Sequence, residues 1–353
     1  MADFTTVKNP GLYFNTVLYT GNGSNGRAIT GVGHQPDLVW IKNRDASEEH
    51  LWYDSVRGAD KLIRSNNTAA DATTSTTTYF NSFDSDGFTI GSETGMNANG
   101  QDIVAWNWKA GTTGSGTTGG SGTSKAYTYS VSATAGFSII RYLGNQTSGH
   151  AIPHHLADTP KFILVKNLAD TRNWNTYHHS QGATKYMVFN NNDPEASSAS
   201  LWNDTSPTSS NFILGSGQNV NQTDSAHVAY CFAEKRGYSK FGSYTGNGNA
   251  NGTFIYTGFK PAFAIVKCTS HSGESWWVGD NKRTGYNVSQ KPFLANSTNV
   301  EVDASYQAVD FLSNGIKWRG TNDRVNASGK SYTYIALAEA PLVGTNNIPC
   351  TAR

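Results

Sequence analysis

The stretch PDLVWIK, residues 36–42, has the pattern of a β-strand that enters a hydrophobic core. It begins at Pro36, continues through apolar side chains and ends at a lysine, and proline is tolerated at the first position of a strand. The same pattern occurs twice more, as PKFILVK at 160–166 and as PAFAIVK at 261–267. A strand that occurs three times in one chain indicates an internal repeat.

Other features of the sequence recur in the same order. Trp52, Trp174 and Trp276 lie 16, 14 and 15 residues after Pro36, Pro160 and Pro261, respectively. Short alternating strands follow at 85–91, 209–215 and 313–320, and Asn-rich turns follow at 97–100, 221–224 and 326–329. Closing strands are expected at 102–110, 227–234 and 332–339. We therefore interpret the chain as three copies of one unit, with these prolines and tryptophans as its framework.

A glycine-rich turn precedes each of these strands. YTGNGSNG (19–26) has the G-x-G-x-x-G spacing of a dinucleotide-binding turn, and it returns as YTGNGNANG (244–252) and, eroded, as YLGNQTSG (142–149). A pyrophosphate site needs a helix after the glycines, whereas RAITGVG and TFIYTGF are strand-like. We predict a hairpin turn instead, in which the glycines meet the demands of backbone geometry. The framework glycines are Gly21, Gly144 and Gly246.

The spacing of the repeats divides the chain. We predict units at 1–110, 125–235 and 236–343, and a C-terminal tail at 344–353. All residues from 111 to 124 are Gly, Ser or Thr, which indicates a flexible linker or exposed loop. The second and third units follow each other directly, so we expect them to pack rigidly and the first unit to be joined more loosely.

Composition favours an all-β fold. Only 15% of the residues are charged, where about 25% is typical, and 36 are glycine. Period-2 strands between turns rich in Gly, Asn and Ser predict three tandem β-sandwich units, jelly-roll or lectin-like, with little helix.

Charge and hydropathy argue against several kinds of partner. A net charge of +1 without a basic run gives no footprint for nucleic acid, and no apolar run approaches the length of a membrane helix. The N-terminus lacks the pattern of a signal peptide. Cys231, Cys268 and Cys350 are odd in number and far apart, so we predict no disulfide framework and a reducing compartment.

Several short motifs resemble metal or catalytic sites, but none has the set of residues that such a site needs. DSDG (84–87) resembles the start of a calcium loop, but the twelfth position holds Gly95 in place of an acid. The groups Glu48–His50, His154–His155 and His178–His179 are predicted to be solvated loop residues. No nucleophile elbow or identifiable carboxylate pair is present. We predict no catalytic residues, no metal ligands and no cofactor.

Aromatic residues that occur in one unit only are candidates for surface binding. Trp202, Trp277 and Trp318 have no tryptophan counterpart in the other copies. Flat aromatic faces stack on apolar surfaces of ligands. We therefore predict that these three side chains lie on loops, where they contact a sugar or a protein partner.

The strings YTGNG, PDLVWIKNR, FDSDGFTIG, VAWNWKAG and GYSKFGSYTGNG resemble repeats of virion structural proteins of tailed bacteriophages, especially marine ones. Such proteins are often labelled tail fibre or structural protein. The resemblance covers about residues 14 to 343 and implies a β-rich, oligomeric, non-enzymatic particle component.

From this resemblance we expect a tail-fibre, spike or head-decoration protein at the virion surface, assembled in the bacterial host cytoplasm. Its partners would be other virion proteins and further copies of itself, with a trimer favoured, and neither nucleic acid nor membrane. The binding alternative is a receptor-recognition module that holds a host glycan. The enzymatic alternative is a polysaccharide depolymerase.

Overall fold

Each copy of the repeated strand lies inside a large antiparallel sheet, and a smaller sheet packs over one face of it. The structure, a computed structural model, describes residues 5–341. The three copies are β3 (Leu38–Asn43), β15 (Pro160–Asn167) and β23 (Phe263–Cys268). Every residue of β3 and β23 is buried, because alternate side chains face the small sheet of the same unit and the neighbouring units. The prediction of an all-β sandwich fold is confirmed.

The first unit contains a six-stranded sheet in the order β1-β9-β3-β4-β5-β6 and a three-stranded sheet in the order β2-β8-β7. The other elements are η1 (Pro10–Leu12), β1 (Phe14–Thr20), β2 (Arg27–Thr30), β4 (Leu51–Asp54), β5 (Gly58–Arg64), β6 (Ala72–Thr73), β7 (Phe80–Asp84), β8 (Gly87–Ile90), α1 (Thr94–Asn97) and β9 (Asp102–Trp108).

The second unit contains an eight-stranded sheet in the order β10-β12-β13-β20-β15-β16-β17-β18 and a small sheet in the order β11-β14-β19. Its other elements are β10 (Thr112–Thr117), β11 (Gly119–Gly120), β12 (Ala126–Ser132), β13 (Phe137–Leu143), β14 (His150–Pro153), β16 (Asn175–His178), β17 (Lys185–Val188), β18 (Ala196–Ser197), α2 (Ala199–Trp202), β19 (Asn211–Leu214), α3 (Gln218–Asn221) and β20 (Ala226–Ala233).

The third unit contains a five-stranded sheet in the order β21-β28-β23-β24-β25 and a small sheet in the order β22-β27-β26. Its other elements are β21 (Ser239–Thr245), β22 (Phe254–Tyr256), β24 (Trp277–Asp280), β25 (Phe293–Leu294), η2 (Ser305–Gln307), β26 (Val309–Leu312), β27 (Gly315–Trp318) and β28 (Ser331–Leu337). Among the described residues, no helix is long and apolar enough to span a membrane.

The Gly/Ser/Thr-rich segment at 111–124 is not the flexible linker that its composition predicts. It forms β10 and β11, and β10 pairs with β12, which extends the large sheet of the second unit beyond β13. The glycines make this pairing work, because a Cβ atom on Gly114 or Gly116 would lie 2.5 Å or 2.8 Å from the hydroxyl oxygen of Tyr129 or Tyr127. The tyrosine rings thus supply the apolar surface that the segment lacks.

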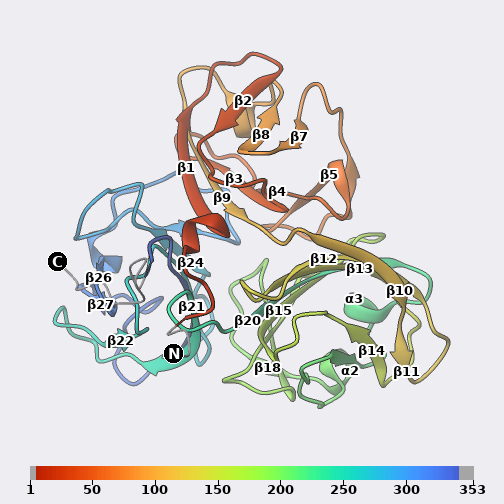
Figure 1. Ribbon diagram of the computed structural model, residues 1–353. Coiled ribbons are helices and arrows are strands. Elements are labelled where there is room, and N and C mark those ends of the chain that lie inside the picture. The colour runs from red at the N-terminus through yellow and green to blue at the C-terminus, as the bar shows by residue number, and fades with distance from the viewer. Residues whose placement is uncertain (1–4, 342–353) are drawn as a thin grey trace.

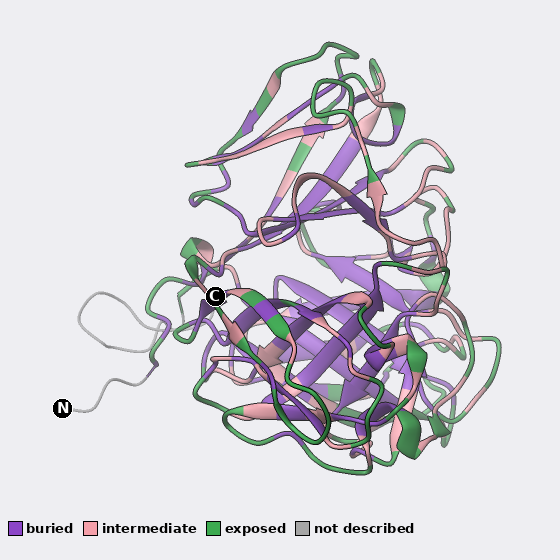
Figure 2. Ribbon diagram, turned by 90° about the vertical axis from the view of Figure 1, so that its right-hand side faces the viewer, coloured by how far each residue is buried: buried purple, intermediate pink, exposed green. Residues whose placement is uncertain are grey.

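The three units share one hydrophobic core, so the prediction that the first unit is loosely joined is wrong. Figure 1 shows three lobes that meet at a common centre. The core there takes side chains from every unit, including Trp40, Trp174 and Phe263. In Figure 2 the buried strands run through this interior, and exposed residues lie on the outer loops. The first unit is therefore held by the sheet faces that contribute side chains to the common core, and the length of the connector does not decide how tightly it packs.

The glycine-rich turn does not close a hairpin. β1 pairs with β9 and β2 pairs with β8, so residues 21–26 carry the chain from the large sheet to the small one. The middle and last copies do the same between β13 and β14 and between β21 and β22. The prediction of a hairpin is therefore wrong. Glycine and asparagine suit the backbone of the turn, but the strands on either side of it pair with other strands of the unit.

Candidate functional site

The surfaces between units hold most of the buried polar chemistry. Strand pairing shows which residues occupy the same place in each unit. Leu38, Phe162 and Phe263 are paired with Asp54, His178 and Asp280, respectively. Each of these three polar residues is buried and reaches into the next unit.

Asp54 joins the first unit to the second. Its Oδ1 accepts hydrogen bonds from the backbone N–H groups of Val56 and Arg57, at 3.1 and 2.9 Å. Its Oδ2 is paired with the Arg57 guanidinium and accepts a 2.7 Å hydrogen bond from the hydroxyl of Tyr230. Because the carboxylate is buried, these donors offset the cost of removing its charge from water.

Asp280 joins the third unit to the first in the same way. Its Oδ1 accepts from the backbone N–H of Lys282 and of Arg283, both at 3.0 Å. Its Oδ2 is paired with Arg283 Nε at 2.7 Å and accepts a 3.1 Å hydrogen bond from Trp106 Nε1. Trp106 and Tyr230 occupy equivalent places, since they pair with Trp40 and Leu164.

His178 completes the cycle from the second unit to the third. The hydroxyl of Ser180 lies 2.8 Å from His178 Nδ1, and Nε2 lies 3.2 Å from the backbone oxygen of Tyr334. Burial lowers the pKa of His178 to about 3, so the ring is neutral and can donate one hydrogen bond while it accepts the other. The three units are therefore held by a cyclic set of contacts.

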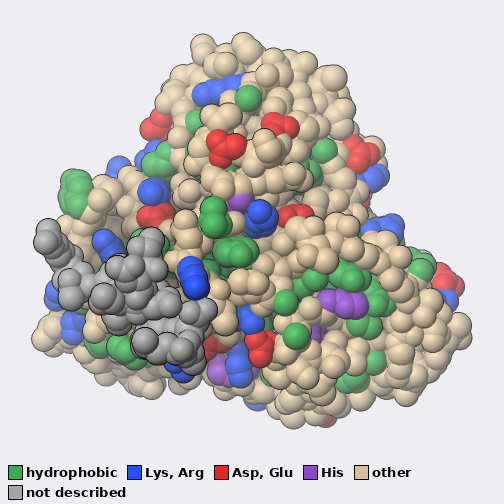
Figure 3. All heavy atoms as spheres, in the orientation of Figure 1, with side chains coloured by type: hydrophobic (Ala, Val, Ile, Leu, Met, Phe, Trp, Pro, Cys, Tyr) green, Lys and Arg blue, Asp and Glu red, His purple; other side chains and the backbone are tan. Residues whose placement is uncertain are grey.

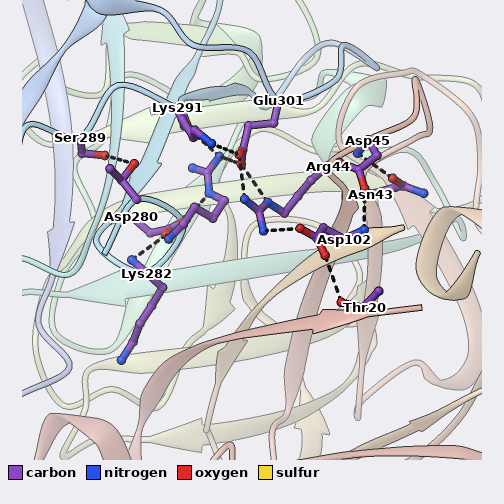
Figure 4. Close-up of polar contacts among 12 residues, drawn as sticks. Thr20, Asn43, Arg44, Asp45, Asp102, Asp280, Lys282, Ser289, Lys291 and Glu301 are labelled. Carbon is purple, nitrogen blue, oxygen red and sulfur yellow. Dashed lines mark hydrogen bonds and ion pairs between the residues drawn. The ribbon is translucent and has the colours of Figure 1, made fainter. Parts of the chain in front are cut away.

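A second ring of contacts involves acidic residues near the ends of the large sheets. The backbone N–H groups of Asp71, Glu195 and Glu301 donate to the carbonyl oxygens of Leu168, Thr269 and Arg44 in the next unit, at 3.0, 3.0 and 2.8 Å, respectively. Figure 4 shows the richest of these sites, between the first and third units. Glu301 accepts from Arg44 at 2.8 and 3.0 Å and from Arg283 at 3.1 Å. Burial opposes ionisation, but these guanidinium groups lower the pKa of Glu301.

Trp52, Trp174 and Trp276 lie at similar distances from their prolines in the sequence, but strand pairing does not place Trp52 at the same position as the other two. Trp174 Nε1 donates to the carbonyl of Arg64 in the first unit, and Trp276 Nε1 donates to that of Val188 in the second, both at 2.9 Å. Strand pairing places His50, not Trp52, at the position of Trp174 and Trp276. The assignment of Trp52 as their counterpart is therefore wrong. His50 lies 14 residues after its proline, as Trp174 does, so the spacing itself contained the signal.

Trp52 still packs in the common core. Its ring lies 5.5 Å from that of Trp174 and 5.4 Å from that of Tyr230. His50 accepts a 2.8 Å hydrogen bond from Trp40 Nε1, and burial lowers its pKa well below the usual value. The prediction of solvated histidines is thus wrong for His50, His154 and His178, which are 0, 0 and 2% exposed and whose rings form hydrogen bonds within the protein. His155 and His179 are partly buried.

The framework glycines lie where no side chain fits. A Cβ atom on Gly21, Gly144 or Gly246 would lie 2.0, 2.3 or 2.2 Å from the carbonyl oxygen of Ala98, Gln222 or Ala327, respectively. The framework prolines Pro36, Pro160 and Pro261 are buried. Glycine is required here because two backbone segments meet.

Three asparagines hold these turns, and the sequence interpretation did not single them out. Asn97, Asn221 and Asn326 are fully buried. The side chain of Asn97 accepts from the backbone N–H of Asn22 at 3.0 Å and donates to the carbonyl oxygens of Ser24 and Gly91 at 2.8 and 2.7 Å. Asn221 and Asn326 make the equivalent contacts. The recurrence of asparagine as the first residue of the turns at 97–100, 221–224 and 326–329 was the available signal.

The lysine that ends each copy of the repeated strand is buried. Lys42, Lys166 and Lys267 are each 0% exposed. The ammonium of Lys42 donates to the carbonyl oxygens of Asn43 and Ala46, at 2.6 and 3.2 Å, and the other two also donate to loop carbonyls. Burial lowers the pKa of all three to about 8. These ammonium groups therefore fix the loops that meet the neighbouring unit.

The tryptophans predicted to lie on the surface do not. Trp202, Trp277 and Trp318 are 1, 1 and 0% exposed and belong to the cores of the second and third sandwiches, so this prediction is wrong. A tryptophan that lacks a counterpart in the other units here reflects a difference in how the cores of the sandwiches are packed. Among residues 5–341, the exposed aromatics lie instead on the third unit and are Phe254, Tyr256, Tyr286 and Tyr306.

The DSDG turn, which resembles the start of a calcium loop, forms hydrogen bonds within the first unit. Asp84 accepts from the hydroxyls of Ser82 and Thr89, and Asp86 accepts from the backbone N–H groups of Gly31 and Gly33. Over residues 5–341 no group of three or more His, Cys, Asp or Glu side chains is arranged to hold a metal ion. Cys231 and Cys268 are free and buried, and Cys350 and the predicted tail at 344–353 lie outside the described residues.

Clefts also open between units. One, of about 460 Å³, lies between the first and second units and is lined by Arg57, Asp71 and Arg141 among others. The larger, of about 590 Å³, lies between the second and third units. Elsewhere the surface seen in Figure 3 is mostly neutral, with scattered charges, as the low content of charged residues leads one to expect.

A family described as "Domain of unknown function (DUF7483)" matches residues 9–341. No curated protein and no solved structure matches the chain. The family match includes all the strands of the three units.

Proposed function

Since the chain belongs to the DUF7483 family over residues 9–341, we propose that its function belongs to the assembled three-unit body: a non-enzymatic structural protein that works by surface contact. One observation carries this proposal. The buried ionisable side chains Asp54, Asp280 and Glu301 are committed to neighbours in another unit, around a core that all three units share. These buried hydrogen bonds and ion pairs hold the three units in place relative to one another.

The resemblance to virion proteins of tailed bacteriophages suggests where this body works. The chain would be a component of the tail fibre, spike or head surface, with other virion proteins as partners. Assembly into homo-oligomers, trimers included, stays part of the proposal. A rigid body that presents three related outer surfaces is suited to repeated weak contacts, whose combined affinity exceeds that of any single contact.

Gold-labelled antibody against this chain, imaged on purified particles by electron microscopy, tests the proposal. We expect label at one defined place on the head, neck or tail. A chain that is produced during infection but never labels purified particles would refute it. Release of reducing sugar from host envelope by the purified protein would contradict the non-enzymatic part of the proposal, and we expect none.

A further inference from the structure

The small sheets of the three units differ at one edge. In the second unit β11 pairs with the outer side of β14, and Gly119 lies opposite Ala151. The equivalent strands are β2 in the first unit and β22 in the third. Over residues 5–341 no strand pairs with the outer side of β2 or β22. The second unit thus shows that this edge of the sandwich can accept a further strand.

At this edge of the third unit the backbone groups of two residues are unpaired. The N–H of Thr257 donates to the carbonyl oxygen of Asn314 at 3.0 Å, so Thr257 faces β27. Because bonded residues alternate along an antiparallel ladder, Phe254 and Tyr256 face away from β27. Within the part of the chain that the structure describes, their N–H and C=O groups have no hydrogen-bond partner. Such an edge is a template for pairing with another chain.

The opposite edge of the same small sheet is closed. Ser289 and Val309 exchange two backbone hydrogen bonds of 2.8 Å across the outer side of β26. The side chain of Asn287 donates to the carbonyl oxygen of Phe311 at 3.1 Å and accepts from its N–H at 3.0 Å. Residues 287–289 therefore occupy the place of a further strand beside β26, and β22 is left as the open edge of this sheet.

Two exposed aromatic rings accompany the unpaired backbone groups of β22. Phe254 and Tyr256 are 43% and 64% exposed. They lie on the same, outer face of the sheet, because side chains alternate along a strand and Ile255 between them is buried in the core of the sandwich. Exposed apolar side chains beside an open strand edge indicate an interaction surface.

The other two units carry no aromatic residue at these places. Strand pairing gives the counterparts, which are Ala28 and Ala151 for Phe254, and Thr30 and Pro153 for Tyr256. Proline has no N–H, and within a sheet it occurs at edges. The edge of the second unit is thus closed by β11 and a proline, and that of the first unit presents small side chains.

We propose that β22 binds β22 of a second copy of this chain, with the two strands antiparallel across a twofold axis. The strand is self-complementary: when Ile255 lies opposite its own copy, Phe254 of each chain lies opposite Tyr256 of the other. Each such pair exchanges both backbone hydrogen bonds and forms an aromatic cross-strand contact. β22 contains no charged residue, so no like charges meet at the axis.

This interface rests on the homo-oligomeric assembly proposed above and names its surface. Sedimentation equilibrium of the purified full chain, from about 5 μM to about 500 μM, tests it. A contact through one short strand is small, so we expect a dimer with a Kd of about 10–100 μM. A chain that stays monomeric at about 500 μM would refute the interface, even if antibody still labels the particles. Open-ended growth beyond a dimer would also refute the twofold pairing.

Two variants introduce residues that the other units already carry, so the sandwich should still fold. Phe254→Ala removes one aromatic partner, and Tyr256→Pro removes an N–H that faces away from β27 as well as the other ring. Each should raise the Kd of the dimer by about tenfold or more. Tyr286→Ala is the control: this side chain is 78% exposed and precedes the residues that close the opposite edge, and its loss should leave the Kd unchanged.

Amide hydrogen exchange of the wild-type chain locates the contact independently of any variant. The N–H groups of Phe254 and Tyr256 should exchange more slowly at about 500 μM than at about 5 μM, because only the dimer supplies them with acceptors. Exchange at these two positions that does not depend on concentration, in a sample that does form dimers, would place the interface elsewhere and overturn the proposal. Dimerisation of Phe254→Ala and Tyr256→Pro with the wild-type Kd would do the same.

Discussion

The hydroxyl of Tyr230 donates a 2.7 Å hydrogen bond to the carboxylate of Asp54, and this contact joins the second unit to the first inside the common core. Trp106 and Asp280 form the equivalent contact between the first and third units. Two units that contribute one partner each to a buried, charge-assisted hydrogen bond cannot separate without exposing both groups. The structure therefore behaves as one body, and the predictions below test this view.

Tyr230→Phe should lower the free energy of unfolding by about 1.5–3 kcal/mol, since it removes one hydrogen bond to a buried carboxylate and changes little else. Urea unfolding followed by tryptophan fluorescence measures it. Tyr286→Phe is the control, because that side chain is 78% exposed, and it should have no effect. Equal stability of Tyr230→Phe and wild type would mean that the contact does not couple the units.

The three units should unfold in a single transition. Phe189 lies within 6.5 Å, ring centre to ring centre, of Trp40 in the first unit, Trp174 in the second and Trp276 in the third. Phe189→Ala should cost about 3–5 kcal/mol and shift the whole transition. Scanning calorimetry checks both points, and equal calorimetric and van't Hoff enthalpies are expected. Separate melting of the first unit would contradict the common core.

Gly21→Ala should destabilise the protein by about 1–3 kcal/mol, because the new methyl group would meet the carbonyl oxygen of Ala98 at 2.0 Å and the backbone must shift. Gly119→Ala is the matched control: no atom lies within 4 Å of its Cβ position. Chemical unfolding of both variants gives the comparison. If the two substitutions had the same effect, the close contact would not be the reason for glycine at position 21.

Stability should rise with pH between about 8 and 9. Burial lowers the pKa of Lys42, Lys166 and Lys267 from 10.5 to about 8. Within this window the unfolded chain binds protons that the folded chain has released, so the free energy of unfolding increases as pH rises. Below about pH 8 the lysines are protonated in both states and add no further slope.

Urea unfolding at intervals from pH 7 to about pH 9 measures this effect, and the upper limit keeps tyrosine in the unfolded chain mostly protonated, since its ordinary pKa is about 10. Lys166→Met should reduce the slope, whereas Lys317→Gln, on the partly exposed β27, should leave it unchanged. A free energy that falls between pH 8 and 9 would show that the ammonium groups are stabilised in the folded protein.

Part of the candidate site could be predicted from the sequence and part could not. The repeat and the sandwich fold follow from local patterns, since strand periodicity and turn chemistry act over a few residues. The need for Gly21 to be small does not, because it comes from contact with the backbone of Ala98. The equivalence of His50 with Trp174 could not be read from a search for tryptophans, because strand pairing and not residue type sets the register. The burial of Trp202 likewise depends on the sheet that packs over it.

The order of residues is enough to predict three β-sandwich units, because side-chain alternation along a strand and the turn preferences of Gly and Asn act over a few residues. The tertiary structure alone brings the three units around one core and pairs residues 112–117 as a strand over Tyr127 and Tyr129. Each of these depends on surfaces brought together from distant parts of the chain. Two surfaces bury each other only where their shapes are complementary, and the residues of a single strand do not specify this.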